Sequence, residues 1–378
     1  MLEVDINNSG SFMTLKKDGR SFRFHAIWLR DNALDESTRD PASKQKLITL
    51  QDIPKDIKLN SAVVRAGEVF CTFSPENKII RYSSDWLLNH TYDTPLETNK
   101  IKLGSGNVLW DKKLEDTVPQ CDINELEGNA TSLQKWLFDI SKFGFAKAVG
   151  MSGVPGEIFR IVKLFGYVRE TNYGRHFEVR TEVNPVNLAY TGLALQAHTD
   201  NPYRDPVPTL QVLSCIENSA KGGENMVVDG HKIAMDIYNE DPEGFSCLTN
   251  FPARFSYNGS KEVSLQAKKP IIELSPDNEL LCVRFNSRST APLVDIPFNS
   301  MEKYYSAYRR FADLVEEPKN QVAFKLKPGE AFIVDNTRVL HSRKGYSGSG
   351  KRWLQGCYAD KDSLLSKLRI LKNLDVRS

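Results

Sequence analysis

The hydrophobic pattern of the first part of the chain predicts short strands joined by tight turns. Apolar and polar side chains alternate in residues 12–16 and 21–25, on either side of Asp18-Gly19. An Asp-Gly pair between two alternating runs favours a two-residue β-hairpin turn. The same alternation returns in residues 69–73 and 79–82. This region therefore predicts a small β-rich unit.

A change of composition predicts a domain boundary near residue 100. The stretch from residue 92 to about residue 106 is polar and is punctuated by proline and glycine, which is typical of a linker. A chain of 378 residues also exceeds one typical domain. We expect a β-rich N-terminal domain over residues 1–100 and a larger domain over residues 101–378.

Beyond the linker the hydrophobic period changes to that of helices and then returns to that of strands. Apolar residues from Leu133 to Ile140 recur at helical spacing and stop before Gly144, and residues 145–149 then alternate like a strand. Between Val207 and Val339 several short strands recur around a helical insertion. We expect further helices over residues 158–165, 229–239 and 298–315. Strands on both sides of such an insertion fit a mainly β fold with helices, a double-stranded β-helix or jelly roll.

Composition excludes several classes of partner. Fifty basic residues against 48 acidic ones leave a net charge of +2, which argues against binding to nucleic acid or to a membrane surface. The apolar runs are too short to cross a bilayer, and the first residues do not resemble a secretory signal. The six cysteines include no Cys-x-x-Cys pair, so we expect reduced thiols and a cytoplasmic protein.

The strongest chemical signal is the motif His198-Thr199-Asp200, followed far along the chain by His341 and Arg352. A His-x-Asp pair by itself is more often a solvated turn, but here it lies between strand-like runs, and His341 follows another. Two imidazoles and one carboxylate leave three positions open on Fe(II) for a chelating cosubstrate and O₂. An arginine nearby can hold a carboxylate by two parallel hydrogen bonds. The motif therefore predicts an iron site that uses a dicarboxylate cosubstrate.

Several motifs together resemble the γ-butyrobetaine hydroxylase branch of the Fe(II)/2-oxoglutarate dioxygenases. They are Trp28 to Asn32, Asn187 to Tyr190, His198 to Asp200, Gly222-Gly223, and His341 to Arg352. The resemblance covers nearly the whole chain. It implies a jelly-roll domain, Fe(II), 2-oxoglutarate as cosubstrate, O₂, hydroxylation of a small trimethylammonium substrate, and a homodimer.

The resemblance also implies roles for individual residues. His198, Asp200 and His341 would hold iron, and Arg352 would hold the distal carboxylate of 2-oxoglutarate. Asn187 and Asn225 would also contact the cosubstrate. A quaternary ammonium group has no hydrogen to donate, so aromatic faces must hold it, although a single tyrosine is more often part of a core. The family's aromatic cage aligns with Tyr173, Phe177, Tyr190 and Tyr358, and the remaining substrate residues would be Asn201, Tyr203, Asn286 and Arg288.

Three departures from the branch pattern set the finer expectations. The motif at Trp28 to Asn32 is typically followed by cysteines that hold zinc, but here no cysteine precedes Cys71, so we expect no zinc in the N-terminal domain. Asn201 and Arg288 replace weaker donors, which favours an anion bulkier than a carboxylate. In this the chain is similar to hydroxylases of 2-(trimethylammonio)ethylphosphonate.

Three functions follow from these expectations. The first is hydroxylation of 2-(trimethylammonio)ethylphosphonate to its 1-hydroxy product, a step of organophosphonate catabolism. The second is hydroxylation of γ-butyrobetaine to carnitine. The third is a jelly-roll binding protein in which the same residues hold a structural metal. A closed structural site would require a fourth protein ligand, which argues against the third function.

Overall fold

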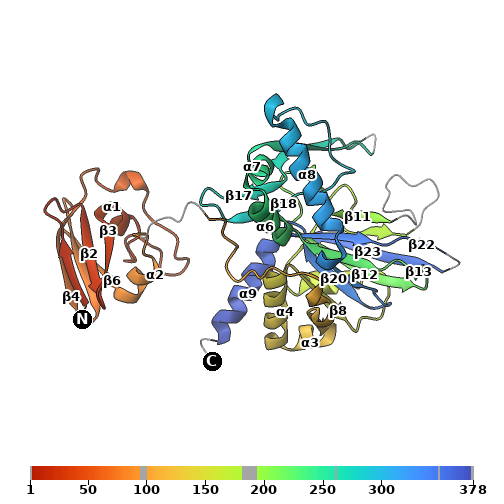
Figure 1. The fold of residues 1–378 in the computed structure, drawn as a ribbon. Coiled ribbons are helices and arrows are strands. Elements are labelled where there is room, and N and C mark those ends of the chain that lie inside the picture. Colours follow the sequence, from red (N-terminus) through yellow and green to blue (C-terminus); the bar gives the residue numbers. More distant parts are fainter. Residues whose placement is uncertain (1, 94–99, 181–193, 260–261, 348–349, 376–378) are drawn as a thin grey trace. The chain divides into compact units, whose positions relative to one another are not determined.

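The computed structural model describes residues 2–93, 100–180, 194–259, 262–347 and 350–375, and it divides the chain into two compact units (Figure 1). The N-terminal unit covers Met1–Glu97 and the C-terminal unit covers Thr98–Ser378. Each unit has hydrophobic core clusters of its own. Among the described residues, no helix is both long and apolar enough to span a membrane.

The N-terminal unit consists of two three-stranded antiparallel sheets and two short helices. The predicted hairpin around Asp18-Gly19 is confirmed, because Lys17 pairs with Arg20 and the two turn residues have φ angles of 52° and 77°. Such a pair of positive φ angles defines the primed turn that hairpins favour. The elements are β1 (Leu2–Ile6), β2 (Phe12–Lys17), β3 (Arg20–His25), α1 (Ala26–Asp31), β4 (Lys58–Arg65), β5 (Glu68–Ser74), β6 (Lys78–Ser83), α2 (Ser84–Asn89) and a 3₁₀ turn at Leu50–Asp52.

A charged network anchors the loop that follows α1. Arg30 has a side chain that is only 5% exposed, and it donates to both carboxylate oxygens of Glu76, at 2.6 and 3.0 Å. It also donates to the Thr38 hydroxyl, which donates in turn to Asp35. Burial raises the pKa of Asp35, but hydrogen bonds from Lys78, Ser37 and Thr38 outweigh this and lower it to about 2. Ion pairs and hydrogen bonds therefore fix a loop for which the sequence offers no thiolate ligands.

The C-terminal unit is built on two facing sheets, the arrangement expected for a jelly roll. The larger sheet has the order β10-β23-β12-β20-β8-β7, with β9 also paired to β23, and the smaller sheet has the order β11-β21-β14-β19. The strands of the two sheets are β7 (Gln120–Asp122), β8 (Phe145–Val149), β9 (Val168–Arg169), β10 (Phe177–Val179), β11 (Leu195–His198), β12 (Leu210–Asn218), β14 (Asn225–Asp229), β19 (Gln321–Phe324), β20 (Ala331–Asp335), β21 (Val339–Arg343) and β23 (Arg352–Ala359).

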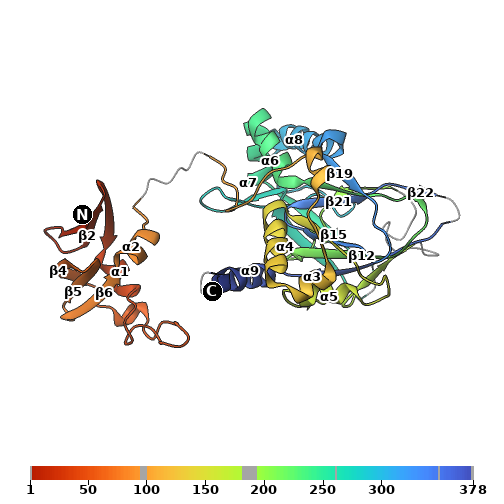
Figure 2. The same ribbon diagram turned by 90° about the horizontal axis from the view of Figure 1, so that it is seen from below.

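Helices cover the outer face of each sheet (Figures 1 and 2). The larger sheet is covered by α3 (Ile123–Gly128), α4 (Ala130–Phe143), α5 (Ile158–Lys163) and α9 (Lys361–Asp375), and the smaller by α6 (Gly230–Glu240), α7 (Pro242–Asn250) and α8 (Met301–Glu316). The predicted end of α4 is confirmed, because Gly144 caps it with a φ of 80°. The predicted helices near α5, α6 and α8 are also present, whereas α3, α7 and α9 were not predicted.

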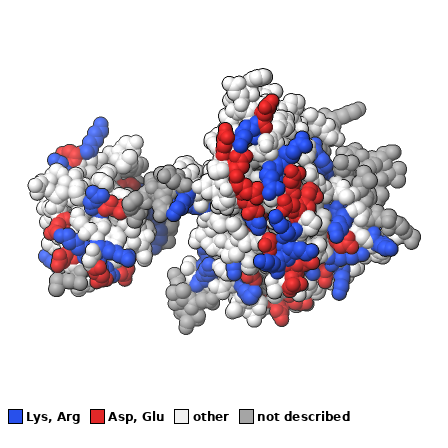
Figure 3. Space-filling model, viewed as in Figure 1, with Lys and Arg blue, Asp and Glu red and all other residues white. Residues whose placement is uncertain are grey.

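The remaining pieces are short. They comprise the two-stranded pairs β13 (Lys221–Gly222) with β22 (Tyr346–Ser347), β15 (Pro252–Tyr257) with β16 (Leu265–Pro270), and β17 (Ile272–Leu274) with β18 (Leu280–Val283), and 3₁₀ turns at Lys112–Thr117, Phe298–Ser300 and Pro318–Asn320. On the face of the C-terminal unit seen in Figure 3, basic and acidic side chains lie interspersed.

The two-residue period of the strands decides which side chains enter the space between the sheets. In β12, Leu210 and Val212 pack under the outer helices, whereas Leu213 and Cys215 belong to the inner core. In β23, Cys357 likewise lies on the outer face, where it packs under the helices. Alternate residues of neighbouring strands therefore share one inner face, and the functional side chains described below lie on it.

We predict that the Arg30 network replaces a structural metal. Arg30→Ala leaves the Glu76 carboxylate without its buried partner, and breaking such a pair costs about 3–5 kcal/mol of unfolding free energy. Lys46→Ala is the control, because Lys46 and Asp31 form a more exposed pair worth at most about 1 kcal/mol. Urea unfolding of the full chain, followed by tryptophan fluorescence with and without EDTA, measures both. An equal loss of unfolding free energy in the two variants, or destabilisation of the N-terminal unit by EDTA, would contradict the prediction.

Candidate functional site

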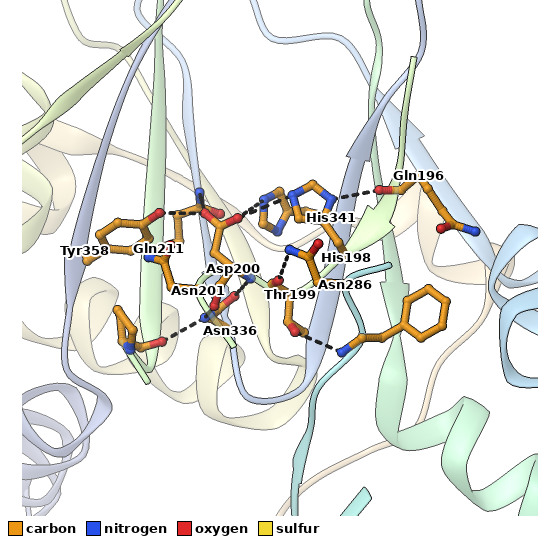
Figure 4. A network of polar contacts seen from close by, with 12 residues as sticks. Gln196, His198, Thr199, Asp200, Asn201, Gln211, Asn286, Asn336, His341 and Tyr358 are labelled. Atoms are coloured by element: carbon orange, nitrogen blue, oxygen red, sulfur yellow. Dashed lines mark hydrogen bonds and ion pairs between the residues drawn. The ribbon is translucent and has the colours of Figure 1, made fainter. Parts of the chain in front are cut away.

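Three of the predicted residues converge where the smaller sheet meets the loop after β11 (Figure 4). His198 ends β11 and is paired with His341 of β21 in the sheet register. Asp200 Oδ1 lies 3.3 Å from His198 Nε2 and 3.8 Å from His341 Nε2. One ligand atom from each residue lies within 4.8 Å of the other two, and among the described residues this is the group of His, Cys, Asp or Glu that could hold a metal ion.

Hydrogen bonds to the backbone hold the segment that carries these ligands. His198 Nδ1 lies 2.7 Å from the carbonyl oxygen of Gln196, which leaves Nε2 directed toward Asp200. The side chain of Asn336 accepts from the Asp200 amide and donates to the Asp200 and Pro208 carbonyls, at 2.6, 2.9 and 2.8 Å. The ligands are therefore positioned before any metal binds.

The protonation states suit a divalent cation. Burial lowers the pKa of His341 to about 3, so the imidazole is neutral and offers a lone pair. Burial alone would raise the pKa of Asp200, but its hydrogen bond with His198, its electrostatic interaction with both histidines and the hydrogen bond from Tyr358 hold it below its usual range. Two imidazoles and one carboxylate fit Fe(II), and three protein ligands leave coordination positions open.

A cavity of about 380 Å³ opens beside the three ligands, between the two sheets. Arg352 lines it from β23 and is buried, at 5% exposed. Its Nη2 donates to Asn225 Oδ1 at 3.0 Å and its Nε to the Gly223 carbonyl at 3.3 Å. Asn225 Nδ2 has no partner among the described residues, so it remains a donor for a bound ligand. Asn187, the other residue predicted to contact the cosubstrate, lies outside the described residues.

Aromatic rings form another wall of this cavity. The ring centroid of Phe177 lies 6.2 Å from that of Tyr173 and 5.2 Å from that of Tyr358. Tyr203 also lines the cavity, and its hydroxyl is 2.9 Å from the Tyr173 hydroxyl. Three of the four predicted cage residues are thus brought together, and the fourth, Tyr190, lies outside the described residues.

Gly356 makes room for the aromatic wall. It is the residue of β23 paired with Phe177 of β10, and a Cβ atom at this position would collide with the Phe177 ring. The absent side chain lets the ring lie against the sheet next to Tyr358. The signal for this role was present in the sequence only as a glycine within a strand-like run.

The predicted acid end of the site also borders the cavity. Asn201 has a φ of 53° and accepts a hydrogen bond from the Tyr203 hydroxyl at 2.6 Å, which leaves its Nδ2 without a partner among the described residues. Asn286 donates to the Thr199 carbonyl at 3.1 Å, so its Oδ1 is the atom left over. Arg288 lines the cavity as an exposed side chain, and its charge contributes to the low pKa of His341.

Sequence reasoning missed three residues of the site. Gln211 donates to Asp200 Oδ2 at 2.6 Å, and a polar side chain between the apolar residues Leu210 and Val212 of β12 was the available signal. Tyr257 stacks on Tyr203 with centroids 5.1 Å apart, and it lies in the insertion, where no pattern indicated it. Arg343 lines the cavity two residues after His341, on the same inner face of β21.

We predict that Asp200 is the charged metal ligand. Asp200→Ala should weaken binding of a divalent cation by at least about 10-fold, because even the loss of an outer partner of a metal ligand costs that much. Titration of the full chain with Co(II), followed by visible absorbance, measures the change. Asp205→Ala is the control, since Asp205 lies in the same loop and pairs with Lys269 at the surface. Wild-type affinity in the Asp200 variant would contradict the assignment.

Comparison with known proteins agrees with this geometry. Residues 115–358 match the model of the taurine catabolism dioxygenase TauD, TfdA family. The chain is 30% identical over 356 residues to gamma-butyrobetaine dioxygenase of Pseudomonas sp. (strain AK-1), covering 94% of this chain and 92% of that protein. It is 29% identical over 365 residues to mitochondrial trimethyllysine dioxygenase of Mus musculus, covering 95% of this chain and 85% of that protein.

Among solved structures, asparagine oxygenase (AsnO) aligns with 14% identity and a TM-score of 0.49, covering 63% of this chain and 82% of that one. The family match includes strands of both sheets and the His198, Asp200 and His341 cluster. It argues against the alternative of a non-enzymatic binding protein. The chain belongs to the TauD, TfdA family, in its γ-butyrobetaine hydroxylase branch, and is an Fe(II)- and 2-oxoglutarate-dependent dioxygenase with a jelly-roll catalytic domain.

Proposed function

We propose that this dioxygenase hydroxylates a small trimethylammonium acid. The observation that carries the proposal is the cavity beside His198, Asp200 and His341, which is lined by aromatic rings and by polar side chains. Aromatic faces attract a quaternary ammonium group through their quadrupole without requiring a hydrogen to donate. The names of the relatives support this, since γ-butyrobetaine and trimethyllysine both carry a trimethylammonium group.

The residues of the chain divide the work of binding and orientation. Bound Fe(II) and 2-oxoglutarate, with O₂, supply the oxidising chemistry, and the protein supplies placement. Arg352 would hold the distal carboxylate of 2-oxoglutarate, and Asn225 would keep the guanidinium plane in position through their 3.0 Å hydrogen bond. Tyr173, Phe177 and Tyr358 would hold the cation. Asn201 and Arg288 would hold the acid end of the substrate.

We predict that Arg352 determines the affinity for the cosubstrate. Arg352→Lys keeps the charge but loses the planar pair of donors, so the KM for 2-oxoglutarate should rise by about 10-fold, the value of one charge-assisted hydrogen bond. The KM for the betaine should change little. Arg369→Lys, in the outer helix α9, is the control. An unchanged KM for 2-oxoglutarate would mean that another residue holds its distal carboxylate.

The acid group of the substrate is a choice between a carboxylate and a phosphonate. The names of the two relatives support γ-butyrobetaine, with carnitine as product, more than they support the phosphonate. What favours 2-(trimethylammonio)ethylphosphonate as a second candidate is the cationic side chain of Arg288 at the cavity, which Asn201 also lines. A phosphonate offers three oxygens and up to two charges, so it can engage both donors at once.

A competition experiment decides between the two acids. We expect the wild-type chain, given equal amounts of γ-butyrobetaine and 2-(trimethylammonio)ethylphosphonate with Fe(II) and 2-oxoglutarate, to consume one of them preferentially, as followed by mass spectrometry. Arg288→Ala should reduce kcat/KM for the phosphonate by about 10-fold or more. It should reduce kcat/KM for γ-butyrobetaine less, because a carboxylate has fewer oxygens that can accept hydrogen bonds from Arg288. Preferential use of γ-butyrobetaine would eliminate the phosphonate candidate. Turnover of neither betaine would overturn the proposed substrate class.

A further inference from the structure

The carboxylate of Asp200 is held asymmetrically. Gln211 Nε2 and the Tyr358 hydroxyl both donate to Oδ2, at 2.6 and 2.8 Å. The other oxygen, Oδ1, is the one that lies 3.3 and 3.8 Å from the histidine Nε2 atoms (Figure 4). With two donors on Oδ2, the lone pairs of Oδ1 remain directed toward the metal position. The arrangement therefore selects a single oxygen of Asp200 as ligand.

Tyr358 differs from Gln211 because it also faces the cavity with its ring. The centroid of its ring lies 5.2 Å from that of Phe177, so the ring belongs to the aromatic wall, while the hydroxyl donates a hydrogen bond to Asp200. The side chain is only 5% exposed. One side chain thus contacts both the substrate region and a metal ligand.

We propose that Tyr358 is a positioning residue that couples occupancy of the aromatic wall to the strength of the Asp200 ligand, with Gln211 as the second donor that keeps Oδ1 on the metal. The proposal rests on the proposed function, since it requires a cation over the ring. It goes beyond the cage role expected for Tyr358, which concerns its ring alone.

The physical basis of the coupling is polarisation of the phenol. A cation over the ring face withdraws electron density from it, which makes the O–H group a stronger donor to Asp200. A stronger hydrogen bond on Oδ2 holds the carboxylate more firmly in the orientation that directs Oδ1 toward the metal. Bound betaine should therefore strengthen the hold of Asp200 on the metal. Thermodynamic linkage requires that the metal strengthen betaine binding by the same factor.

The test measures binding of Co(II) by the full chain in the presence of 2-oxoglutarate, so no turnover is needed. Affinities are measured alone, with γ-butyrobetaine, and with 5,5-dimethylhexanoate, in which a neutral tert-butyl group replaces the cation. In the wild-type chain we expect γ-butyrobetaine to lower the Co(II) Kd by about fivefold, the lower end of typical coupling between sites. We expect the neutral analogue to lower it less.

Three variants isolate the phenol. Tyr358→Phe keeps the ring and should weaken Co(II) binding by about 10-fold while losing most of the effect of γ-butyrobetaine. Gln211→Leu removes the other donor, so it should weaken Co(II) binding but retain the effect of the betaine. Tyr305→Phe is the matched control, because Tyr305 lies on the outer helix α8, is 51% exposed and does not line the cavity. It should leave Co(II) affinity and the coupling factor as in the wild type.

Two results would overturn the coupling. One is a Tyr358→Phe chain with wild-type Co(II) affinity, and the other is the same response to γ-butyrobetaine with and without the hydroxyl. If neither γ-butyrobetaine nor 2-(trimethylammonio)ethylphosphonate binds to the wild-type chain, the proposed substrate class fails and the coupling with it. In that case the Co(II) affinities of Tyr358→Phe and Gln211→Leu still decide whether these donors position Asp200.

Discussion

The site depends on one ion pair that is almost completely removed from solvent, between Asp229 and Arg338, whose side chains are 0% and 1% exposed. Burying two charges is costly unless every polar atom finds a partner. Here Arg338 donates to both oxygens of Asp229 and to the carbonyls of Lys142 and Val108, while Asp229 also accepts from the amides of Trp110 and His231. The pair therefore joins the end of β14, the end of α4 and the segment that precedes the sheets at one point.

The Asp229–Arg338 ion pair lies at the start of β21, the strand that carries His341. The turn from Asp335 to Arg338 is held by Arg338, and within it Asn336 binds the backbone of Asp200. The end of α4 can approach the start of β21 this closely only with glycine at position 144, because a Cβ atom there would lie 2.6 Å from a methyl group of Val339. One turn thus sets the positions of metal ligands that are far apart in the sequence. Breaking the ion pair would leave an uncompensated buried charge and would also disturb the register of β11 and β21.

The sequence predicted those parts of the fold that depend on local patterns. The Asp18-Gly19 hairpin, the end of α4 at Gly144 and the joining of His198, Asp200 and His341 follow from turn chemistry, capping and ligand type. Helix α9 was missed, although Leu364, Leu368 and Leu371 give it a buried stripe and Asp360 directly precedes its first residue as a candidate N-cap. The partners of Asp229 and Asp200 were also missed. These contacts join segments more than 100 residues apart, or depend on which face of a strand is turned inward, and neither is visible in a local pattern.

The pairing of Gly356 with Phe177 has an evolutionary consequence. Because a methyl group at position 356 would occupy the space of the ring, the two positions cannot vary independently. A lineage that retains an aromatic ring at 177 must retain glycine at 356, whereas one with a small side chain at 177 is free to place alanine there. Covariation of these two positions among homologues would thus record how the volume available to the substrate's head group has changed, without any change in the iron ligands.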